Sequence, residues 1–221
     1  QVSKDGTRKC LFEFADGASV ETVYMQYSYG SSICISSQVG CMMGCSFCAS
    51  TMEGLSRNLT AGEMLGEVFR MCRLTGDRIS HIVVMGMGEP FDNYDELSRF
   101  LRLIHNSKGY NLGLRNITVS TCGIIPVIER FADDFPQVNL AVSLHASNDD
   151  RRRELMPVAR RYDYDSLMKT CRDYTIRTGR RITFEYSMIS GENDSEHSAI
   201  ELADRLSGWL THVNLIPLNK V

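Results

Sequence analysis

Short apolar segments rich in Val, Ile and Thr alternate along this chain with longer segments in which apolar residues recur at helical spacing. Apolar runs without a polar alternation are typical of strands that are buried on both faces, as in a parallel sheet. Six predicted strands fit this description, at residues 32–39, 81–87, 116–122, 138–146, 181–189 and 212–218. The alternation predicts an α/β fold with helices outside a parallel sheet.

The segments between these strands carry helical signals, at residues 60–76, 93–106, 125–135, 163–179 and 194–208. The first has well-defined ends, because Thr60 and Glu63 have capping-box spacing and Gly76 follows the last apolar position. Ahead of the first strand, residues 10–25 predict a hairpin that turns at an Asp-Gly pair.

Repeated βα crossovers produce either an open doubly wound sheet or a barrel. No glycine-rich phosphate-binding turn follows the first strand, which favours a barrel. We therefore expect an incomplete (βα)6 barrel at residues 31–221, with an N-terminal β-hairpin extension at residues 1–30. The chain starts without Met and stops after the sixth strand, so we also expect it to be a fragment of a longer protein.

Composition narrows the classes of function only slightly. A net charge of −3 argues against a uniformly basic nucleic-acid-binding protein, so any such contact must come from a local patch. No segment approaches the roughly 18 apolar residues of a membrane helix, and the N-terminus has no apolar signal core. We expect a cytoplasmic protein with no membrane attachment and with reduced cysteines.

The strongest chemical signal is the run CMMGCSFC at residues 41–48, which holds Cys41, Cys45 and Cys48. A structural zinc site closes a tetrahedron with four ligands, whereas three thiolates on an iron–sulfur cubane leave one iron open. Gly44 allows the backbone to turn within the loop, and Phe47 is placed to shield a bound cluster from water. A zinc site completed by a distant His or Cys remains the alternative.

Polar or conformationally permissive residues also end most of the other predicted strands. The working residues of parallel α/β folds gather at these ends, so we take them as candidate ligand-binding residues. They are Gly88 and Glu89 in GMGEP, Ser120 in STCG, Ser143, Leu144 and His145 in SLHA, and Asn219 in PLN.

The C-x3-C-x2-C spacing resembles that of the radical S-adenosylmethionine superfamily. The resemblance implies that the three thiolates hold a [4Fe–4S] cluster, whose open iron is chelated by the methionine part of S-adenosylmethionine. It implies that GMGEP takes the amino group of this cofactor, with Glu89 opposite the ammonium and with Gly86 and Gly88 allowing a close approach. The remaining strand-end candidates would then hydrogen-bond or flank the same cofactor.

A longer series of motifs resembles the RlmN family: CISSQVGC, FCAST, RNLTAGE, MGMGEP, STCGI, SLHASND, LMPV, ITFEY and HVNLIPLN, in this order. The resemblance implies a methyltransferase that modifies carbon 2 of an adenine in 23S rRNA, and in some members a tRNA purine as well. It implies a methyl-cysteine and a 5′-deoxyadenosyl radical, a monomer, and an external electron donor such as flavodoxin or ferredoxin.

The resemblance also assigns two residues near the N-terminus. Cys34, seven residues before Cys41, occupies the position of a cysteine that resolves the enzyme–RNA adduct. Glu21, thirteen residues further upstream, occupies that of a proton acceptor. Without the resemblance, Cys34 would be a small buried strand residue and Glu21 a solvent-facing carboxylate. The family's methyl-carrying cysteine and N-terminal RNA-binding domain lie outside this sequence, so we expect cluster and cofactor binding without turnover.

Two other functions remain open. A Cfr-type enzyme, which methylates carbon 8 of the same adenine, shares the cluster, the cofactor and the counterpart of Cys34. A non-catalytic iron–sulfur or zinc module would need no GMGEP motif and would not cleave S-adenosylmethionine. The arginines of DDRRRELMPVARRY suggest either RNA contact at the rim or a solvated helix face; they are Arg151, Arg152, Arg153, Arg160 and Arg161.

Overall fold

The computed structural model describes residues 1–218, and within them an eight-stranded sheet has the order β1-β2-β3-β6-β7-β8-β9-β10. Six of its strands run parallel. They are β3 (Gly30–Ile35), β6 (Ile79–Val84), β7 (Ile117–Thr121), β8 (Asn139–Ser143), β9 (Ile182–Met188) and β10 (Thr211–Pro217). Five of the predicted parallel strands are therefore present with their ends shifted by a few residues, and the first is present only as far as Ile35.

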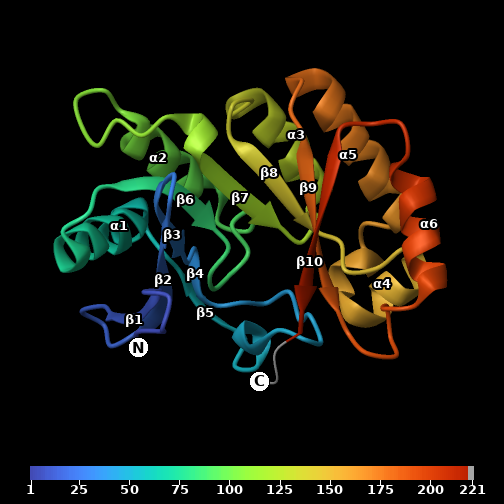
Figure 1. Cartoon of the computed structure of the whole chain (residues 1–221), viewed down its shortest axis with the longest axis horizontal. Helices are drawn as coiled ribbons and strands as arrows, with labels where there is room; N and C mark the ends of the chain where they lie inside the picture. Colours follow the sequence, from blue (N-terminus) through green and yellow to red (C-terminus); the bar gives the residue numbers. More distant parts are fainter. Residues whose placement is uncertain (219–221) are drawn as a thin grey trace.

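The order of the parallel strands never reverses along the chain. Right-handed crossovers in a sheet of this order place every helix on the same side, which curves the sheet into a barrel wall. Figure 1 shows the helices along the outside of this curved sheet. The predicted incomplete (βα)6 barrel is confirmed, and the alternative of a doubly wound sheet is not.

The predicted N-terminal hairpin is also present and extends the same sheet beyond β3. It consists of β1 (Arg8–Glu13) and β2 (Ser19–Tyr27), and Gly17 in its turn has φ +83°. β2 pairs antiparallel with β3, with Val23 opposite Cys34.

Five predicted helices occur close to their expected bounds: α1 (Ala61–Thr75), α2 (Tyr94–His105), α3 (Ile125–Asp134), α5 (Tyr164–Thr178) and α6 (Glu196–Leu206). The Thr60–Glu63 capping box forms, and Gly76 ends α1 with a left-handed φ of 78°. Four short helices were not predicted as such: α4 (Asp149–Leu155) and the 3-10 turns Ala49–Thr51, Leu114–Asn116 and Pro157–Arg160. None of the described helices is long and apolar enough to cross a bilayer.

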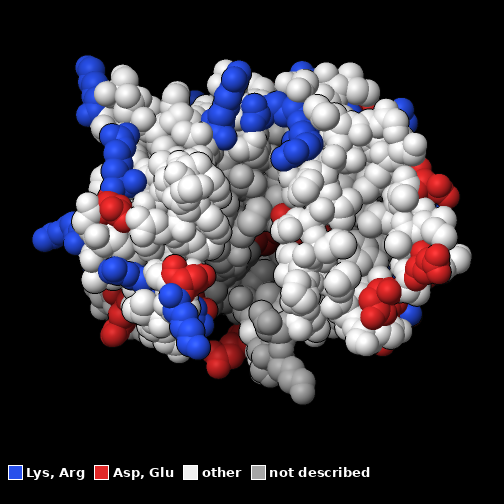
Figure 2. All heavy atoms as spheres, viewed as in Figure 1, with Lys and Arg blue, Asp and Glu red and all other residues white. Residues whose placement is uncertain are grey.

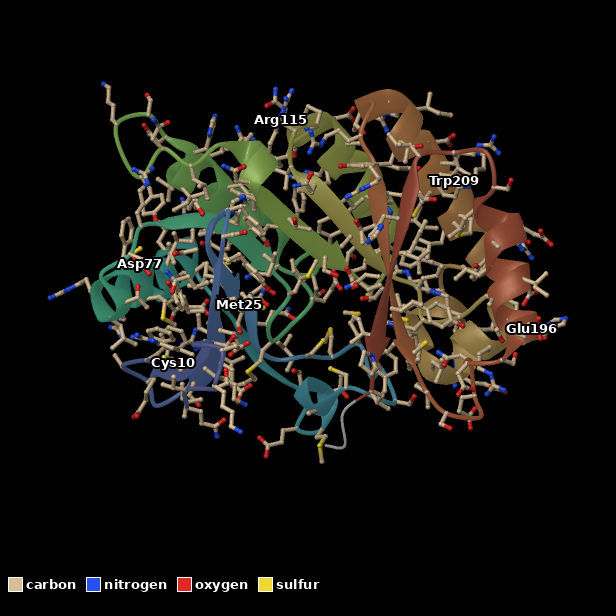
Figure 3. All side chains as sticks on the ribbon, viewed as in Figure 1. Cys10, Met25, Asp77, Arg115, Glu196 and Trp209 are labelled. Carbon is tan, nitrogen blue, oxygen red and sulfur yellow. The ribbon has the colours of Figure 1, made fainter. Side chains whose placement is uncertain are left out.

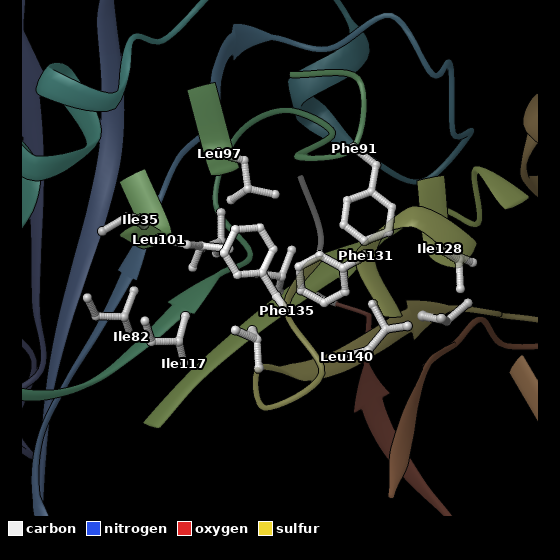
Figure 4. Packing of buried hydrophobic residues seen from close by; sticks show 14 of the residues in the cluster. Ile35, Ile82, Phe91, Leu97, Leu101, Ile117, Ile128, Phe131, Phe135 and Leu140 are labelled. Atoms are coloured by element: carbon white, nitrogen blue, oxygen red, sulfur yellow. The ribbon is translucent and has the colours of Figure 1, made fainter. Parts of the chain in front are cut away.

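The hydrophobic core fills the space between the sheet and the outer helices. Figure 4 shows Phe91, Phe131 and Phe135 packed together with aliphatic side chains of the strands and of α2. The rings of Phe91 and Phe131 lie 5.1 Å apart between centroids. A close-packed layer of this kind holds the strand ends, and the residues that follow them, in fixed positions.

The prediction of a single first strand at residues 32–39 is wrong. β3 stops at Ile35, and Gln38–Gly40 forms β4, which pairs antiparallel with β5 (Leu55–Asn58) in a separate two-stranded sheet. Contacts distant in sequence cause the division, because Ser36 N donates to Glu67 Oε2 and Ser37 N donates to Met87 O. The thiol loop therefore starts from β4, outside the main sheet.

Candidate functional site

A cavity of about 240 Å3 lies at the carboxyl ends of the parallel strands, beside the thiol loop. Parallel α/β barrels carry their active sites at this end. Polar and thiol side chains line it from the loop, from the ends of β6, β7 and β8 and from the middle of β9, among them Cys41, Cys45, Cys48, Glu89, Ser120, Cys122, Ser143, His145 and Glu185. The structure thus gathers most of the candidates that the sequence indicated.

The thiol loop is held at both ends by backbone hydrogen bonds. Cys41 N donates to Gly54 O at 3.0 Å, and Ser46 N donates to Leu155 O at the end of α4, at 2.9 Å. Gly44 has φ +70°, as its predicted role in the turn requires. Phe47 lines the cavity and packs edge-on against the His145 ring, with centroids 4.7 Å apart.

Cys41, Cys45 and Cys48 surround one space instead of converging on one point. Within residues 1–218 no three Cys, His, Asp or Glu side chains are grouped closely enough to hold a single metal ion. A cubane takes each thiolate on a different iron, so it needs three thiols around a shared cavity, which is the arrangement observed. Burial raises the pKa of Cys41 to about 11 and that of Cys45 to about 12, so a metal must displace protons from these thiols. The residues fit a [4Fe–4S] cluster.

Glu89 is buried and its carboxylate is fixed by two backbone donors. Oε2 accepts from Cys122 N at 2.7 Å, and Oε1 accepts from Phe91 N at 3.0 Å. Burial raises the pKa of Glu89, while these hydrogen bonds to the ionised form oppose the rise. The arrangement presents an oriented carboxyl group to the cavity, as binding of an amino group requires.

The two glycines before Glu89 are needed for contacts within the protein itself. A Cβ on Gly88, which has φ +98°, would lie 2.4 Å from the Cβ of Gln38, and one on Gly86 would lie 2.6 Å from Ser36 Oγ. In the described structure, these two glycines therefore allow the loop after β6 to approach the β3–β4 segment of the protein itself. Gln38 in turn accepts from Glu89 N at 2.7 Å, so this packing positions Glu89.

His145 is a buried, neutral histidine with a strained backbone. Its φ is +54°, and its Nδ1 accepts from Ser187 N at 2.9 Å. An Nδ1 that accepts leaves the proton on Nε2, so the ring has an N–H donor for the cavity that it lines. Burial lowers the pKa of His145 to about 3, which keeps this tautomer uncharged at neutral pH.

The other strand-end candidates have different locations. Ser120 and Ser143 line the cavity, as expected. Leu144 has 0% exposure and its side chain packs in the hydrophobic core, so the cavity is not lined by it. Asn219 lies outside the described residues.

Cys34 and Glu21 lie outside the set that lines the cavity. Both are on one face of the sheet, because Val23 pairs with Cys34 and Glu21 is two residues from Val23. Glu21 is half exposed and pairs with Lys9 Nζ at 2.8 Å. Burial raises the pKa of the Cys34 thiol to about 12, so Cys34 is protonated at neutral pH.

Sequence reasoning missed several cavity residues, and two of them carry a thiol or a carboxyl group. Cys122 was placed inside the third parallel strand, but β7 ends at Thr121 and Cys122 lines the cavity beside the three loop thiols. Glu185, within the ITFEY motif, also faces the cavity, and its Oε2 accepts from Asn214 Nδ2 at 2.7 Å. A polar residue inside an otherwise apolar strand was the available signal for Glu185.

The five arginines of the run have different environments, so neither a solvated helix face nor a rim for RNA contact describes all of them. Arg160 and Arg161 are exposed, and Arg151 and Arg153 form ion pairs with carboxylates of Glu154, Glu192 and Asp149. Arg152, by contrast, has 0% exposure.

Comparisons with known proteins identify the superfamily of the chain. The family model described as the radical SAM superfamily matches residues 35–203. A protein named probable dual-specificity RNA methyltransferase RlmN from Lysinibacillus sphaericus is 54% identical over 224 residues, which cover 100% of this chain and 59% of that protein. The protein of the same name from Clostridium perfringens is 53% identical, covering 99% of this chain and 63% of the relative.

Solved structures show the same fold. A radical SAM methyltransferase from Sphaerobacter thermophilus superposes with a TM-score of 0.95 at 53% identity, covering 100% of this chain and 66% of that chain. SuiB from Streptococcus suis, bound to S-adenosylmethionine, gives a TM-score of 0.60 at 17% identity, which supports the fold alone. The chain spans about 60% of the length of the curated relatives that it matches.

Proposed function

The chain belongs to the radical SAM superfamily, and on that premise we propose that it forms the catalytic core of an RNA methyltransferase of the RlmN type. The observation that carries the proposal is the cavity in which three loop thiols face Glu89 and His145. Relatives at 53–54% identity carry the name dual-specificity RNA methyltransferase, which supports the reaction class.

Cys41, Cys45 and Cys48 would hold the [4Fe–4S] cluster, and the rest of the cavity would take S-adenosylmethionine. Together these groups supply reductive radical chemistry when bound. The protein supplies orientation: Glu89, already fixed by Cys122 N and Phe91 N, accepts hydrogen bonds from the amino group of the cofactor.

The remaining cavity residues contribute neutral hydrogen bonds. Ser120, Ser143 and the Nε2–H of His145 are donors at the ends of β7 and β8, suited to the ribose, carboxylate or adenine of the cofactor. Phe47 covers the thiol loop on the side of His145 and limits the access of water. Asn219 and the backbone beside Leu144 are further proposed contacts.

Cys34 would resolve the covalent enzyme–RNA adduct, with Glu21 as proton acceptor. The support is their shared face on adjacent strands, where diagonal neighbours lie roughly 7–8 Å apart. Glu21 is held beside Cys34's strand by its ion pair with Lys9. Cys34 would have to become accessible to the adduct, a change that entry of RNA would have to bring about.

The proposed substrate is an adenine of 23S rRNA, methylated at carbon 2, with tRNA as a second substrate. A base edge reaches such a cavity only when the nucleotide is unstacked and turned out, so a loop or single strand is expected. Figure 2 shows Lys and Arg gathered along one edge of the molecule, and Arg115, labelled in Figure 3, lies there just before β7. That edge is at the opposite end of the strands from the cavity. Arg160 and Arg161 are exposed and follow Met156, which lines the cavity, so they are better candidates for RNA contact.

Cofactor cleavage tests the proposal directly. The chain, reconstituted anaerobically with iron and sulfide and reduced with dithionite, is expected to release 5′-deoxyadenosine from S-adenosylmethionine by cleavage that is not coupled to methylation of RNA. The Cys45→Ser variant, which removes one of the three thiols, should release none. A non-catalytic cluster or zinc module would release none in either protein, and that result would refute the proposal.

The position of the methyl group separates the two related methyltransferase types. Deleting the gene that encodes this chain should remove one methyladenine from ribosomal RNA, and mass spectrometry should identify it as modified at carbon 2. Loss of a carbon 8 methyl group would instead assign the Cfr type. The external reductant, such as a flavodoxin or ferredoxin, would be identified by the protein that replaces dithionite.

A further inference from the structure

Arg152 is a fully buried cation with no acidic partner among residues 1–218. It lies in α4 between Arg151 and Arg153, both of which are paired with carboxylates. Its own side chain has 0% exposure, and its Nε and Nη1 atoms have no hydrogen-bond partner in the described structure. An arginine remains charged in proteins, and burying a charge without a partner is strongly unfavourable. A group that compensates this charge is therefore expected nearby.

The contacts of Arg152 point to the wall of the cavity. Nη2 donates to Cys122 O at 2.6 Å and to Ser143 O at 3.3 Å, so the guanidinium joins the ends of β7 and β8. Cys122 and Ser143 both line the cavity. The positive charge is thus directly behind the wall that faces the three loop thiols.

The helix that carries Arg152 also supports the thiol loop. Leu155 O, at the end of α4, accepts from Ser46 N, and Leu155, Met156 and Cys122 form a small apolar cluster that contacts Cys45. Burial lowers the pKa of Arg152, and its titratable neighbours are the Cys122, Cys171 and Cys45 thiols and the Tyr164 hydroxyl. Burial raises the pKa of each of these groups, so they are neutral and do not compensate the charge. No carboxylate takes the place of these thiols within the described chain.

We infer that Arg152 is a positioning residue that compensates the negative charge of the [4Fe–4S] cluster held by Cys41, Cys45 and Cys48. This inference rests on the proposed cluster site. Three thiolates give the assembled cluster a net negative charge, and reduction adds a further electron. A buried cation behind the cavity wall stabilises the assembled cluster and favours its reduced state, so Arg152 sets the reduction potential.

The carboxylate of S-adenosylmethionine is another anion that could meet this charge. Measurements on the cluster in the absence of the cofactor distinguish between these two candidate anions. If the partner is the cluster, substitution of Arg152 changes the cluster in the absence of S-adenosylmethionine. If the partner is the carboxylate, the change appears only in cofactor affinity.

The test uses three variants, reconstituted anaerobically without cofactor. Arg152→Met removes the charge at similar length, Arg152→Lys keeps the charge, and Arg153→Met is the matched control on the exposed side of α4. The midpoint potential is measured by EPR-monitored redox titration, and cluster retention by the rate of iron loss to a chelator. Arg152→Met should have a more negative potential and lose iron about tenfold faster, a typical effect of outer-shell substitutions. Arg152→Lys should lie between it and the wild type, and Arg153→Met should match the wild type.

Thermal unfolding of the apo and loaded proteins separates this role from a purely structural one. If Arg152 only ties β7 to β8, Arg152→Met lowers the melting temperature equally in both forms and leaves the potential unchanged, which overturns the inference. If Arg152 compensates the charge of the cluster, Arg152→Met lowers the melting temperature more in the loaded protein than in the apo protein. Wild-type protein that takes up no iron refutes the proposed cluster site itself, and the inference with it.

Discussion

Cys122 gives the cavity a fourth thiol, which matters because a fourth ligand would close the cluster to S-adenosylmethionine. Its backbone N donates to Glu89 Oε2, and burial, together with the nearby Glu89, raises the pKa of its thiol well above the usual value. Both effects hold the proton on the Cys122 thiol and favour three ligands over four. We therefore expect Cys122 to support Glu89 and not to bind the cluster.

The Cys122→Ser variant tests this assignment. Serine keeps a hydrogen-bond donor at the same position, so the variant should load as much iron as the wild type and keep its spectral response to the cofactor. Cys48→Ser, which changes a proposed ligand in the same cavity, should lose most of its iron. Iron loss in Cys122→Ser that equals the loss in Cys48→Ser would make Cys122 a ligand.

Glu67 introduces a pH dependence of stability away from the cavity. It is 1% exposed, accepts from Thr22 Oγ1 and from Ser36 N, and has one oxygen without a partner. Burial raises its pKa from 4.5 to about 8. Below pH 4.5, Glu67 is protonated in both the folded and the unfolded protein. Between the two values the folded protein retains a proton that the unfolded chain has released, so stability falls as pH rises through this range.

The Glu67→Gln variant should remove this dependence. Its free energy of unfolding relative to wild type should rise between about pH 5 and pH 8, on the order of a few kcal/mol. Urea unfolding at several pH values measures the difference, and Glu129→Gln, at an exposed site, is the control. A difference that does not change with pH would contradict the raised pKa of Glu67.

At the level of single residues, the sequence predicted which side chains carry reactive groups better than it predicted how buried those side chains are. The spacing of Cys41, Cys45 and Cys48 is local, so it was visible without a structure. The burial of Arg152 was not, because a run of basic residues resembles a solvated helix face and only the packing of α4 against β7 and β8 buries the central one. Cys122 was missed because its position relative to the cavity depends on where β7 ends.

At the level of elements, the loop after β6 depends on its close contact with the β3–β4 segment. The Gly88→Ala variant adds a Cβ at 2.4 Å from Gln38 Cβ, at a φ of +98° that side chains rarely adopt. Strain of this kind should destabilise the fold by about 2 kcal/mol or more, and it should weaken cofactor binding because Gln38 positions Glu89.

A matched glycine in α1 should behave in the opposite way. Gly66 lies within the helix and a Cβ there would meet nothing within 4 Å. Gly66→Ala should therefore stabilise the protein by roughly 0.5–1 kcal/mol through helix propensity. Urea denaturation of both variants measures the contrast. Similar effects in the two would mean that the contact between Gly88 and Gln38 does not determine the loop.

The helices and parallel strands were largely predictable because each has its own periodicity or cap. The Thr60–Glu63 box and Gly76 fixed α1 from local signals alone. The division of β3 from β4 was not predictable, since it depends on hydrogen bonds from Ser36 to Glu67 and from Ser37 to Met87, partners far along the sequence.

At the level of the whole molecule, the barrel brings together residues from nearly the full length of the chain. The loop after β4, the ends of β6, β7 and β8 and the middle of β9 all contribute to one cavity, although Cys41 and Glu185 are far apart in sequence. The sheet extends away from it, and Cys10, labelled in Figure 3, lies on β1 at the opposite edge of the sheet from β10. Within the described residues the barrel therefore gathers the proposed cluster and cofactor ligands into one cavity.

The most direct test of that cavity is the EPR spectrum of the anaerobically reconstituted and reduced chain, recorded with and without S-adenosylmethionine. We expect a [4Fe–4S] signal that changes when the cofactor is added, because three thiolate ligands would leave one iron open to it. A protein that binds zinc in place of iron, or a cluster signal that is indifferent to the cofactor, would contradict the assignment of this cavity.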